Sequence, residues 1–64
     1  MSERPSLLIV DEEAAILESL RILFKNQGFD VVVAQGGRAA LEALERAMPE
    51  LILTDVRMPS VIVI

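Results

Sequence analysis

Three acidic residues lie within two positions of the ends of apolar runs, and their side chains are the ones in this chain best suited to chemistry. Asp11 and Glu12 follow the aliphatic run at 7–10, and Asp55 follows the run at 51–54. The sequence contains no cysteine and no histidine, which excludes thiolate metal sites and the commonest general base. The remaining chemistry is that of carboxylates, which bind hard cations such as Mg²⁺ or act as nucleophiles that are already ionised.

The elements that must position these acids are predicted from changes in hydrophobic period along the chain. Continuous aliphatic runs indicate strands buried on both faces, and apolar residues at three- and four-residue steps indicate amphipathic helices. Gly28 and Pro49 are typical of helix ends. The predicted order is strand 7–10, helix from 14 to Gly28, strand 29–34, helix 38–48, strand 51–54 and strand 61–64. Strands that alternate with helices predict an open parallel sheet with right-handed crossovers.

In such a sheet the carboxyl ends of the strands form the edge where ligands bind. If strands 7–10 and 51–54 are neighbours, Asp11, Glu12 and Asp55 converge there, and a divalent cation such as Mg²⁺ would offset their mutual repulsion. Taken singly, the acids have plainer interpretations: residues 11–13 as an acidic helix N-terminus, and Asp55 as a turn residue. A phosphate-binding loop at residues 36–37 is disfavoured because the glycine spacing does not fit.

Residues 6–59 resemble the first half of a response-regulator receiver domain, the phosphoacceptor module of two-component signalling. The resemblance rests on LLIVDEE, on FKNQGFDVVVAQGG, and on GGRAALEALERAMPELIL followed by TDVRMP. It implies a flavodoxin-like, doubly wound parallel sheet with strand order 2-1-3-4(-5), incomplete in this chain. We expect residues 1–64 to form the N-terminal half of one such domain, with a fourth-strand-like segment at 61–64.

The resemblance also implies roles for the acids. Asp55 would accept a phosphoryl group from a sensor histidine kinase. Mg²⁺ would be held by Asp11, Glu12, Asp55 and the backbone carbonyl of Arg57. Glu12 departs from the family pattern in length, since aspartate is more usual there. The chain would be a signalling switch and not a turnover enzyme.

The end of the sequence departs from the family pattern. About six residues separate strand 51–54 from strand 61–64, whereas a parallel crossover takes a dozen or more. Segment 61–64 is therefore expected to pair antiparallel or with another chain, or a crossover helix has been lost between Ser60 and Val61. The hydroxyl residue, the lysine and the aromatic switch residue of the later strands of receivers have no counterpart here.

Two other functions remain open on the sequence. One is a receiver-like interaction module that is not phosphorylated. The other is a Mg²⁺-dependent hydrolase with an aspartate nucleophile, which is disfavoured because Arg57 stands where such enzymes place a second acid.

Composition narrows the partners and the compartment. The formal charge is −4 and the pI is about 4.5, which argues against direct contact with nucleic acid. The sequence has neither a membrane-spanning run nor a signal-peptide core, so we expect a cytoplasmic chain. The stretch at residues 20–25 resembles the corresponding stretch of receivers that are joined to transcriptional activators. The uncharged strand 61–64 also favours a homodimer or a strand-swapped oligomer.

Overall fold

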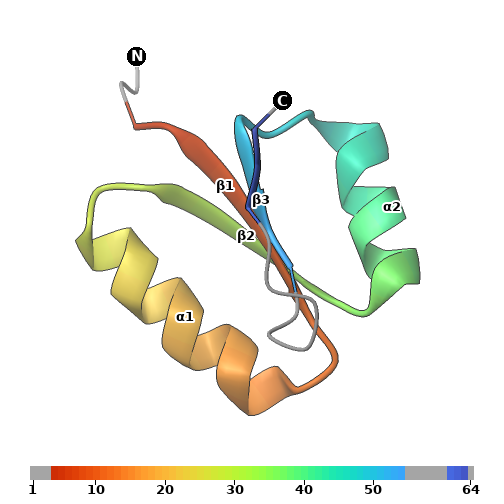
Figure 1. Cartoon of the computed structure of the whole chain (residues 1–64), viewed down its shortest axis with the longest axis horizontal. Helices are drawn as coiled ribbons and strands as arrows, with labels where there is room; N and C mark the ends of the chain where they lie inside the picture. Colours follow the sequence, from red (N-terminus) through yellow and green to blue (C-terminus); the bar gives the residue numbers. More distant parts are fainter. Residues whose placement is uncertain (1–3, 55–60, 64) are drawn as a thin grey trace.

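A computed structural model of the chain describes residues 4–54 and the backbone of residues 61–63. Helices and strands alternate along the chain up to the third strand, as the hydrophobic periods predict (Figure 1). The elements are β1 (Ser6–Asp11), α1 (Ala14–Asn26), β2 (Asp30–Gln35), α2 (Gly37–Arg46), β3 (Leu51–Leu53) and β4 (Val61–Val63).

The strands form one four-stranded sheet with the order β2-β1-β3-β4. β1 lies at the centre of the first three strands and pairs parallel with both neighbours, from Ser6↔Asp30 to Asp11↔Gln35 on one side and from Leu7↔Leu51 to Ile9↔Leu53 on the other. The helices α1 and α2 lie in the two crossover connections. This part of the chain therefore has the flavodoxin-like arrangement expected from the sequence, with the strand order 2-1-3.

The fourth strand is present next to β3, but it runs in the opposite direction. β4 pairs antiparallel with β3, with Leu51 opposite Val63 and Leu53 opposite Val61. This is the antiparallel pairing considered in the sequence analysis, and it differs from the parallel fourth strand of the family pattern. The physical reason is the length of the connection, because so few residues cannot carry the chain back to the start of a parallel strand.

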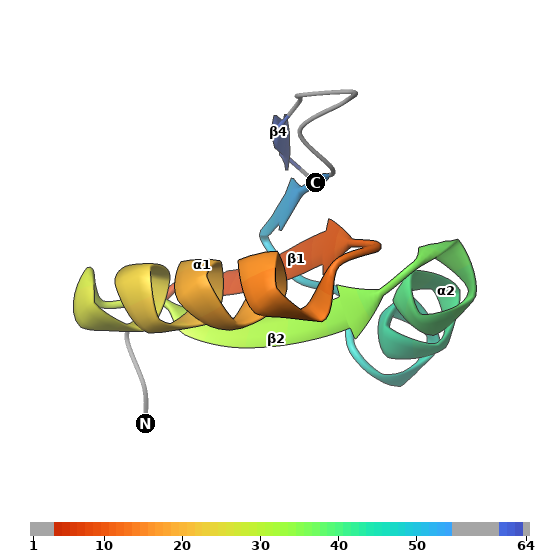
Figure 2. The ribbon, with the colours of Figure 1, turned by 90° about the horizontal axis from the view of Figure 1, so that it is seen from below.

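The core lies on both faces of β1. Leu7 and Ile9 pack against Leu17 of α1, and Ile9 has no exposed surface. Leu8 points to the opposite face because side chains alternate along a strand, and it is also buried. α1 runs along β1 and β2, while α2 lies beside β2 (Figure 2). The two helices therefore cover opposite faces of the β1–β2 pair.

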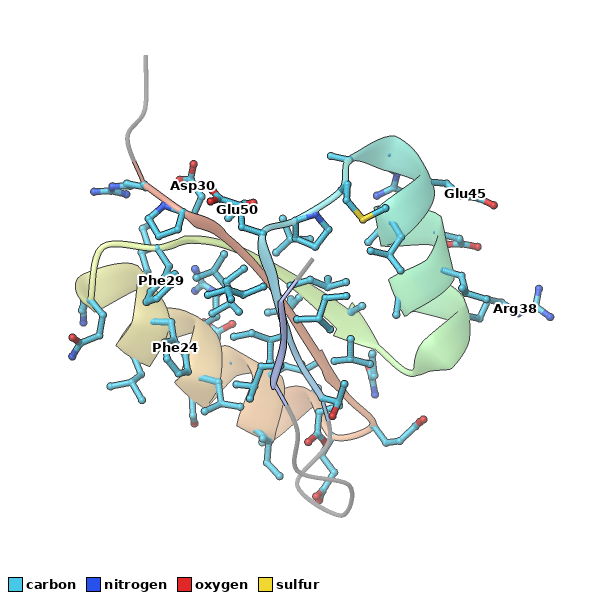
Figure 3. All side chains as sticks on the ribbon, turned by 45° about the horizontal axis from the view of Figure 1, so that its top comes forward. Phe24, Phe29, Asp30, Arg38, Glu45 and Glu50 are labelled. Carbon is cyan, nitrogen blue, oxygen red and sulfur yellow. The ribbon has the colours of Figure 1, made fainter. Side chains whose placement is uncertain are left out.

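The turn after α1 is closed by a glycine and an aromatic pair. Gly28 has a φ of 100°, a backbone conformation that side chains disfavour, and this lets the chain reverse into β2. The rings of Phe24 and Phe29 then meet edge to face, with centroids 5.7 Å apart and an interplanar angle of 82° (Figure 3). This contact holds the end of α1 against the start of β2.

The second helix ends earlier than its hydrophobic pattern predicts. α2 stops at Arg46, whereas the sequence predicted a helix to Met48, and Ala47 is already extended with φ −160° and ψ 134°. Pro49 explains the difference, because a proline disfavours helical backbone at the residue before it. As a result Met48 lies outside the helix and is 63% exposed. Neither α1 nor α2, the helices within the described part of the chain, is long and apolar enough to cross a membrane.

One ion pair on α1 sets the titration of a carboxyl group. The Arg21 guanidinium donates two hydrogen bonds to the Glu18 carboxylate, at 3.1 and 2.6 Å. These bonds are the main cause that holds the pKa of Glu18 below its ordinary value of 4.5. Desolvation opposes them, and the charge of Arg21 adds a smaller lowering. Because the pKa is lower in the folded chain than in the unfolded one, the pair favours folding above about pH 4.5. This contribution is lost as the pH falls through the folded pKa.

Removing the guanidinium should therefore change the titration of Glu18. In Arg21→Met we expect the pKa of Glu18 to rise toward 4.5, measured by NMR titration of its side-chain carboxyl carbon. Lys25→Met, a change of charge further along the same helix, should leave it unaltered. An unchanged titration in Arg21→Met would show that the ion pair does not form in solution.

Candidate functional site

Asp11 ends the central strand and is the one buried charged residue among those described. Its side chain is 3% exposed, and its Oδ1 accepts a hydrogen bond of 2.8 Å from the backbone N–H of Glu13. This local bond turns the chain out of β1 toward α1, whose N-cap residue is Glu13. Asp11 is thus a carboxylate fixed by its own backbone at the carboxyl edge of the sheet.

Glu12 is the next residue, and its side chain is exposed. Its backbone carbonyl oxygen and its carboxylate both lie close to the end of β2. The Nε2 atom of Gln35 donates a hydrogen bond of 3.0 Å to the carbonyl oxygen of Glu12. The carboxylate lies against Gly36, where a Cβ atom would stand 3.4 Å from both Glu12 oxygens.

Gly36 makes a second contact with the acidic segment. Its N–H donates a hydrogen bond of 3.1 Å to the carbonyl oxygen of Asp11, the last residue of β1, which continues the β1–β2 pairing one residue beyond the end of β2. That N–H is therefore engaged within the sheet and is not free to bind a phosphate. We predicted no role for Gln35 or Gly36 from the sequence. The only signal for them was a glycine placed between a strand and a helix.

The third strand ends at the same edge of the sheet as the first. Ile9 pairs with Leu53, and both strands run in the same direction. Counting two residues on from this pair reaches Asp11 in one segment and Asp55 in the other. Asp55 and Arg57, the predicted phosphoacceptor and the predicted carbonyl ligand, lie outside the described residues, and Thr54 is the last described residue before them.

The described part of the predicted metal site consists of two carboxylates. Asp11 and Glu12 supply oxygen donors of the kind that Mg²⁺ takes, so these residues fit a hard divalent cation. No group of three acidic, histidine or cysteine side chains suited to a metal occurs within residues 4–54. The other two predicted ligands, Asp55 and the Arg57 carbonyl, belong to the part of the chain that the structure does not describe.

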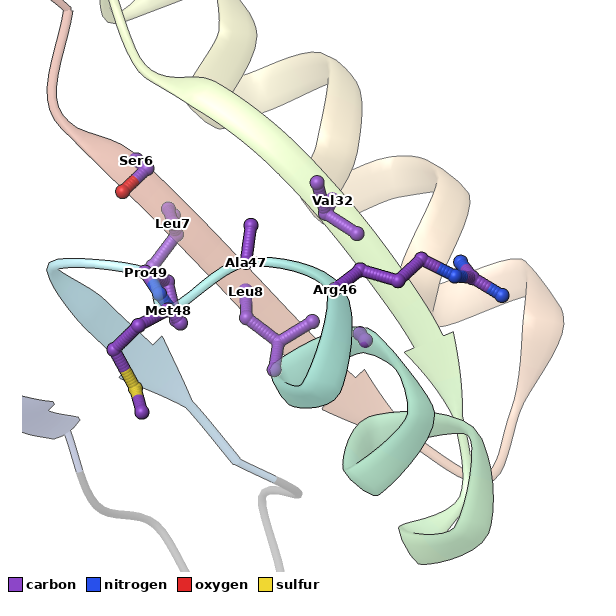
Figure 4. Close-up of a pocket in the computed structure, with 9 residues that line it drawn as sticks. Ser6, Leu7, Leu8, Val32, Arg46, Ala47, Met48 and Pro49 are labelled. Atoms are coloured by element: carbon purple, nitrogen blue, oxygen red, sulfur yellow. The ribbon is translucent and has the colours of Figure 1, made fainter.

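A separate cavity of about 270 Å³ lies between the sheet and the end of α2 (Figure 4). Its lining is largely apolar, with Leu8, Val32, Met48 and Pro49 among the residues, and Arg46 is the charged one. Neither Asp11 nor Glu12 lines it. This cavity is therefore distinct from the acidic edge of the sheet.

Comparison with known proteins decides the family. The sequence pattern of the response regulator receiver domain matches residues 7–62. The chain belongs to the response regulator receiver family. The receiver fold found in residues 4–54, with its parallel strand order 2-1-3, agrees with this membership.

Several curated relatives of this receiver chain are named as response regulators. It is 38% identical over 56 residues to "DNA-binding response regulator MtrA" of Mycobacterium tuberculosis, which covers 88% of this chain and 25% of that protein. It is 40% identical over 53 residues to "Response regulator MprA" of Mycolicibacterium vanbaalenii, covering 83% of this chain and 23% of that protein. The chain thus spans about a quarter of the length of these relatives. No solved structure matches it significantly.

Proposed function

We propose that this chain is a phosphoacceptor receiver, in which Asp55 takes a phosphoryl group from the phosphohistidine of a sensor histidine kinase. The observation that carries the proposal is the parallel pairing of Ile9 with Leu53. This pairing brings the ends of β1 and β3 to one edge of the sheet. β1 ends in Asp11, and in the sequence Asp55 comes two residues after Leu53. Membership of the receiver family supports the same assignment.

The reaction requires a nucleophile and a means of offsetting charge. A carboxylate oxygen of Asp55 would attack phosphorus, the bond from phosphorus to the histidine nitrogen would break, and the product would be an acyl phosphate. An aspartate side chain with its ordinary pKa is already ionised at neutral pH, so this reaction would need no histidine base. The chain would pass a signal by changing between two covalent states and would not turn over a substrate.

The remaining acids would hold the metal. Asp11 and Glu12, with Asp55 and the Arg57 carbonyl, would bind Mg²⁺, which when bound neutralises the charge of the phosphoryl oxygens. The buried position of Asp11 supports this role, because a fixed carboxylate loses little freedom on binding a cation.

We further propose a cytoplasmic location and a role in transcription regulation, the latter because relatives are named DNA-binding response regulators.

The proposal is tested by the metal dependence of phosphorylation. Incubation of the chain with acetyl phosphate and Mg²⁺ should give a species one phosphoryl group heavier, seen by intact-mass spectrometry. The same incubation with EDTA in excess should give none. No adduct in either sample, from a chain shown to be folded by circular dichroism, would favour the alternative of an unphosphorylated interaction module.

A further inference from the structure

The end of β2 contacts the acidic segment at three points. Gln35 and Gly36, which we call the Gln35–Gly36 corner, follow one another at the junction of β2 and α2. Gly36 donates its N–H to the Asp11 carbonyl at 3.1 Å, and Gln35 donates its side-chain amide to the Glu12 carbonyl at 3.0 Å. The Glu12 carboxylate lies against the bare Cα of Gly36. The acidic pair is thus held through its main chain and through one side chain.

A comparison of Gly36 with Gly28 distinguishes the backbone conformation of Gly36 from its contact with Glu12. Gly28 and Gly36 both have a positive φ, 100° and 94°, so a side chain is strained at either position. A Cβ atom at Gly28 would meet nothing within 4 Å, whereas one at Gly36 would touch both oxygens of Glu12. Gly36 therefore lies directly beside this carboxylate, and a methyl group there would stand in van der Waals contact with both of its oxygens.

We infer that Gln35 and Gly36 are positioning residues for Glu12 as a Mg²⁺ ligand, an inference that rests on the proposed function. Glu12 carries one methylene more than an aspartate, and it is exposed, so its carboxylate has more conformations to lose on binding a cation. The corner restricts the main chain of the acidic pair with two hydrogen bonds, and Gly36 lies beside the Glu12 carboxylate. Groups that orient a metal ligand in this way raise affinity for the metal without touching it.

The contribution of Gln35 is tested by the Mg²⁺ affinity of the full chain, measured by titration calorimetry with the metal alone. Gln35→Met keeps the size of the side chain and removes the donor. We expect the dissociation constant for Mg²⁺ to rise by about three- to tenfold, the effect of about one hydrogen bond. Gln27→Met is the matched control, because Gln27 is an exposed glutamine at the far end of α1. The affinity of the Gln27→Met protein for Mg²⁺ should equal that of the wild type.

The contribution of Gly36 is tested against the other strained glycine. Gly36→Ala places a methyl group against the Glu12 carboxylate, and Gly28→Ala introduces similar backbone strain in open space. We expect Gly36→Ala to weaken Mg²⁺ binding by about threefold or more while Gly28→Ala leaves it unchanged. Circular dichroism on each variant checks the fold. If Gln35→Met does not fold, Gln35→Asn takes its place, since it keeps an amide but shortens its reach.

The possible outcomes separate this inference from the proposed function. Weaker Mg²⁺ binding in both corner variants, with both controls at the wild-type value, supports the inference. Weakening in one corner variant alone supports that residue and overturns the role of the other. Equal binding in all five proteins, or equal weakening in corner variants and controls, overturns the inference and leaves the proposed function standing. Absence of Mg²⁺ binding in the wild type overturns the metal site of the proposed function, and the inference with it.

Discussion

Replacing Asp55 by asparagine is expected to abolish phosphoryl uptake by this chain. The amide has nearly the shape of the carboxylate, but it is neutral and a far poorer nucleophile, so it cannot form the acyl phosphate. After incubation with Mg²⁺ and acetyl phosphate, the intact mass of Asp55→Asn should equal that of the same protein without donor. Far-UV circular dichroism should match that of the wild type.

A second aspartate provides the control for this variant. Asp30 begins β2 and pairs with Ser6, at the edge of the sheet opposite to Asp11, and Figure 3 shows it there beside Glu50. Asp30→Asn removes the same charge from the chain and should take up a phosphoryl group as the wild type does. An adduct on Asp55→Asn as abundant as that on Asp30→Asn would mean that another residue is the acceptor.

Truncation of Ile9 should unfold the chain. Ile9 lies in the central strand and has no exposed surface. It is paired with Val33 of β2 on one side and with Leu53 of β3 on the other. Ile→Ala at a buried position costs about 2–5 kcal/mol, from lost burial and from the cavity that is left. Single domains have about 0.05–0.15 kcal/mol of stability per residue, so a chain of 64 residues has only a few kcal/mol in total. We therefore expect Ile9→Ala to lose its cooperative urea transition at 25 °C.

The same substitution at an exposed site shows how much of the expected loss of stability comes from the burial of Ile9. Ile22 lies on α1 and is 48% exposed. Ile22→Ala should change the free energy of unfolding by less than about 1 kcal/mol, because little surface is lost from contact and alanine favours helix. Comparable losses of stability in the two variants would contradict the central position of β1 in the core.

The sheet and its order were predictable because strand burial leaves a strong mark on the sequence. Residues 7–10 and 51–53 are aliphatic without alternation, as expected for strands covered on both faces. An acid within two residues of the end of such a run then marks the carboxyl end of the strand. For Asp11 the structure shows this position together with its burial, and for Asp55 it remains a prediction from the sequence.

Other features depend on contacts that the sequence pattern does not carry. The direction of β4 follows from the length of its connection, which left antiparallel pairing as one of several alternatives. The helical pattern in α2 continues through Met48, but Pro49 acts on the backbone before it and ends the helix at Arg46. The contacts of Gln35 and Gly36 with Glu12 join residues more than twenty positions apart, and neither residue type signals such a contact by itself.

The residue that carries the phosphoryl group is the most direct test of the proposal that Asp55 is the phosphoacceptor. Acetyl phosphate and Mg²⁺ would be added to the wild-type chain, and borohydride would then reduce any acyl phosphate to an alcohol, which converts a phosphorylated aspartate to homoserine. Tryptic cleavage after Arg46 and Arg57 yields a peptide of residues 47–57 that contains Asp55 and Glu50. Tandem mass spectrometry should find homoserine at position 55. Reduction at any other acid of the chain, or at none in the presence of Mg²⁺, would contradict the assignment of Asp55 as the phosphoacceptor.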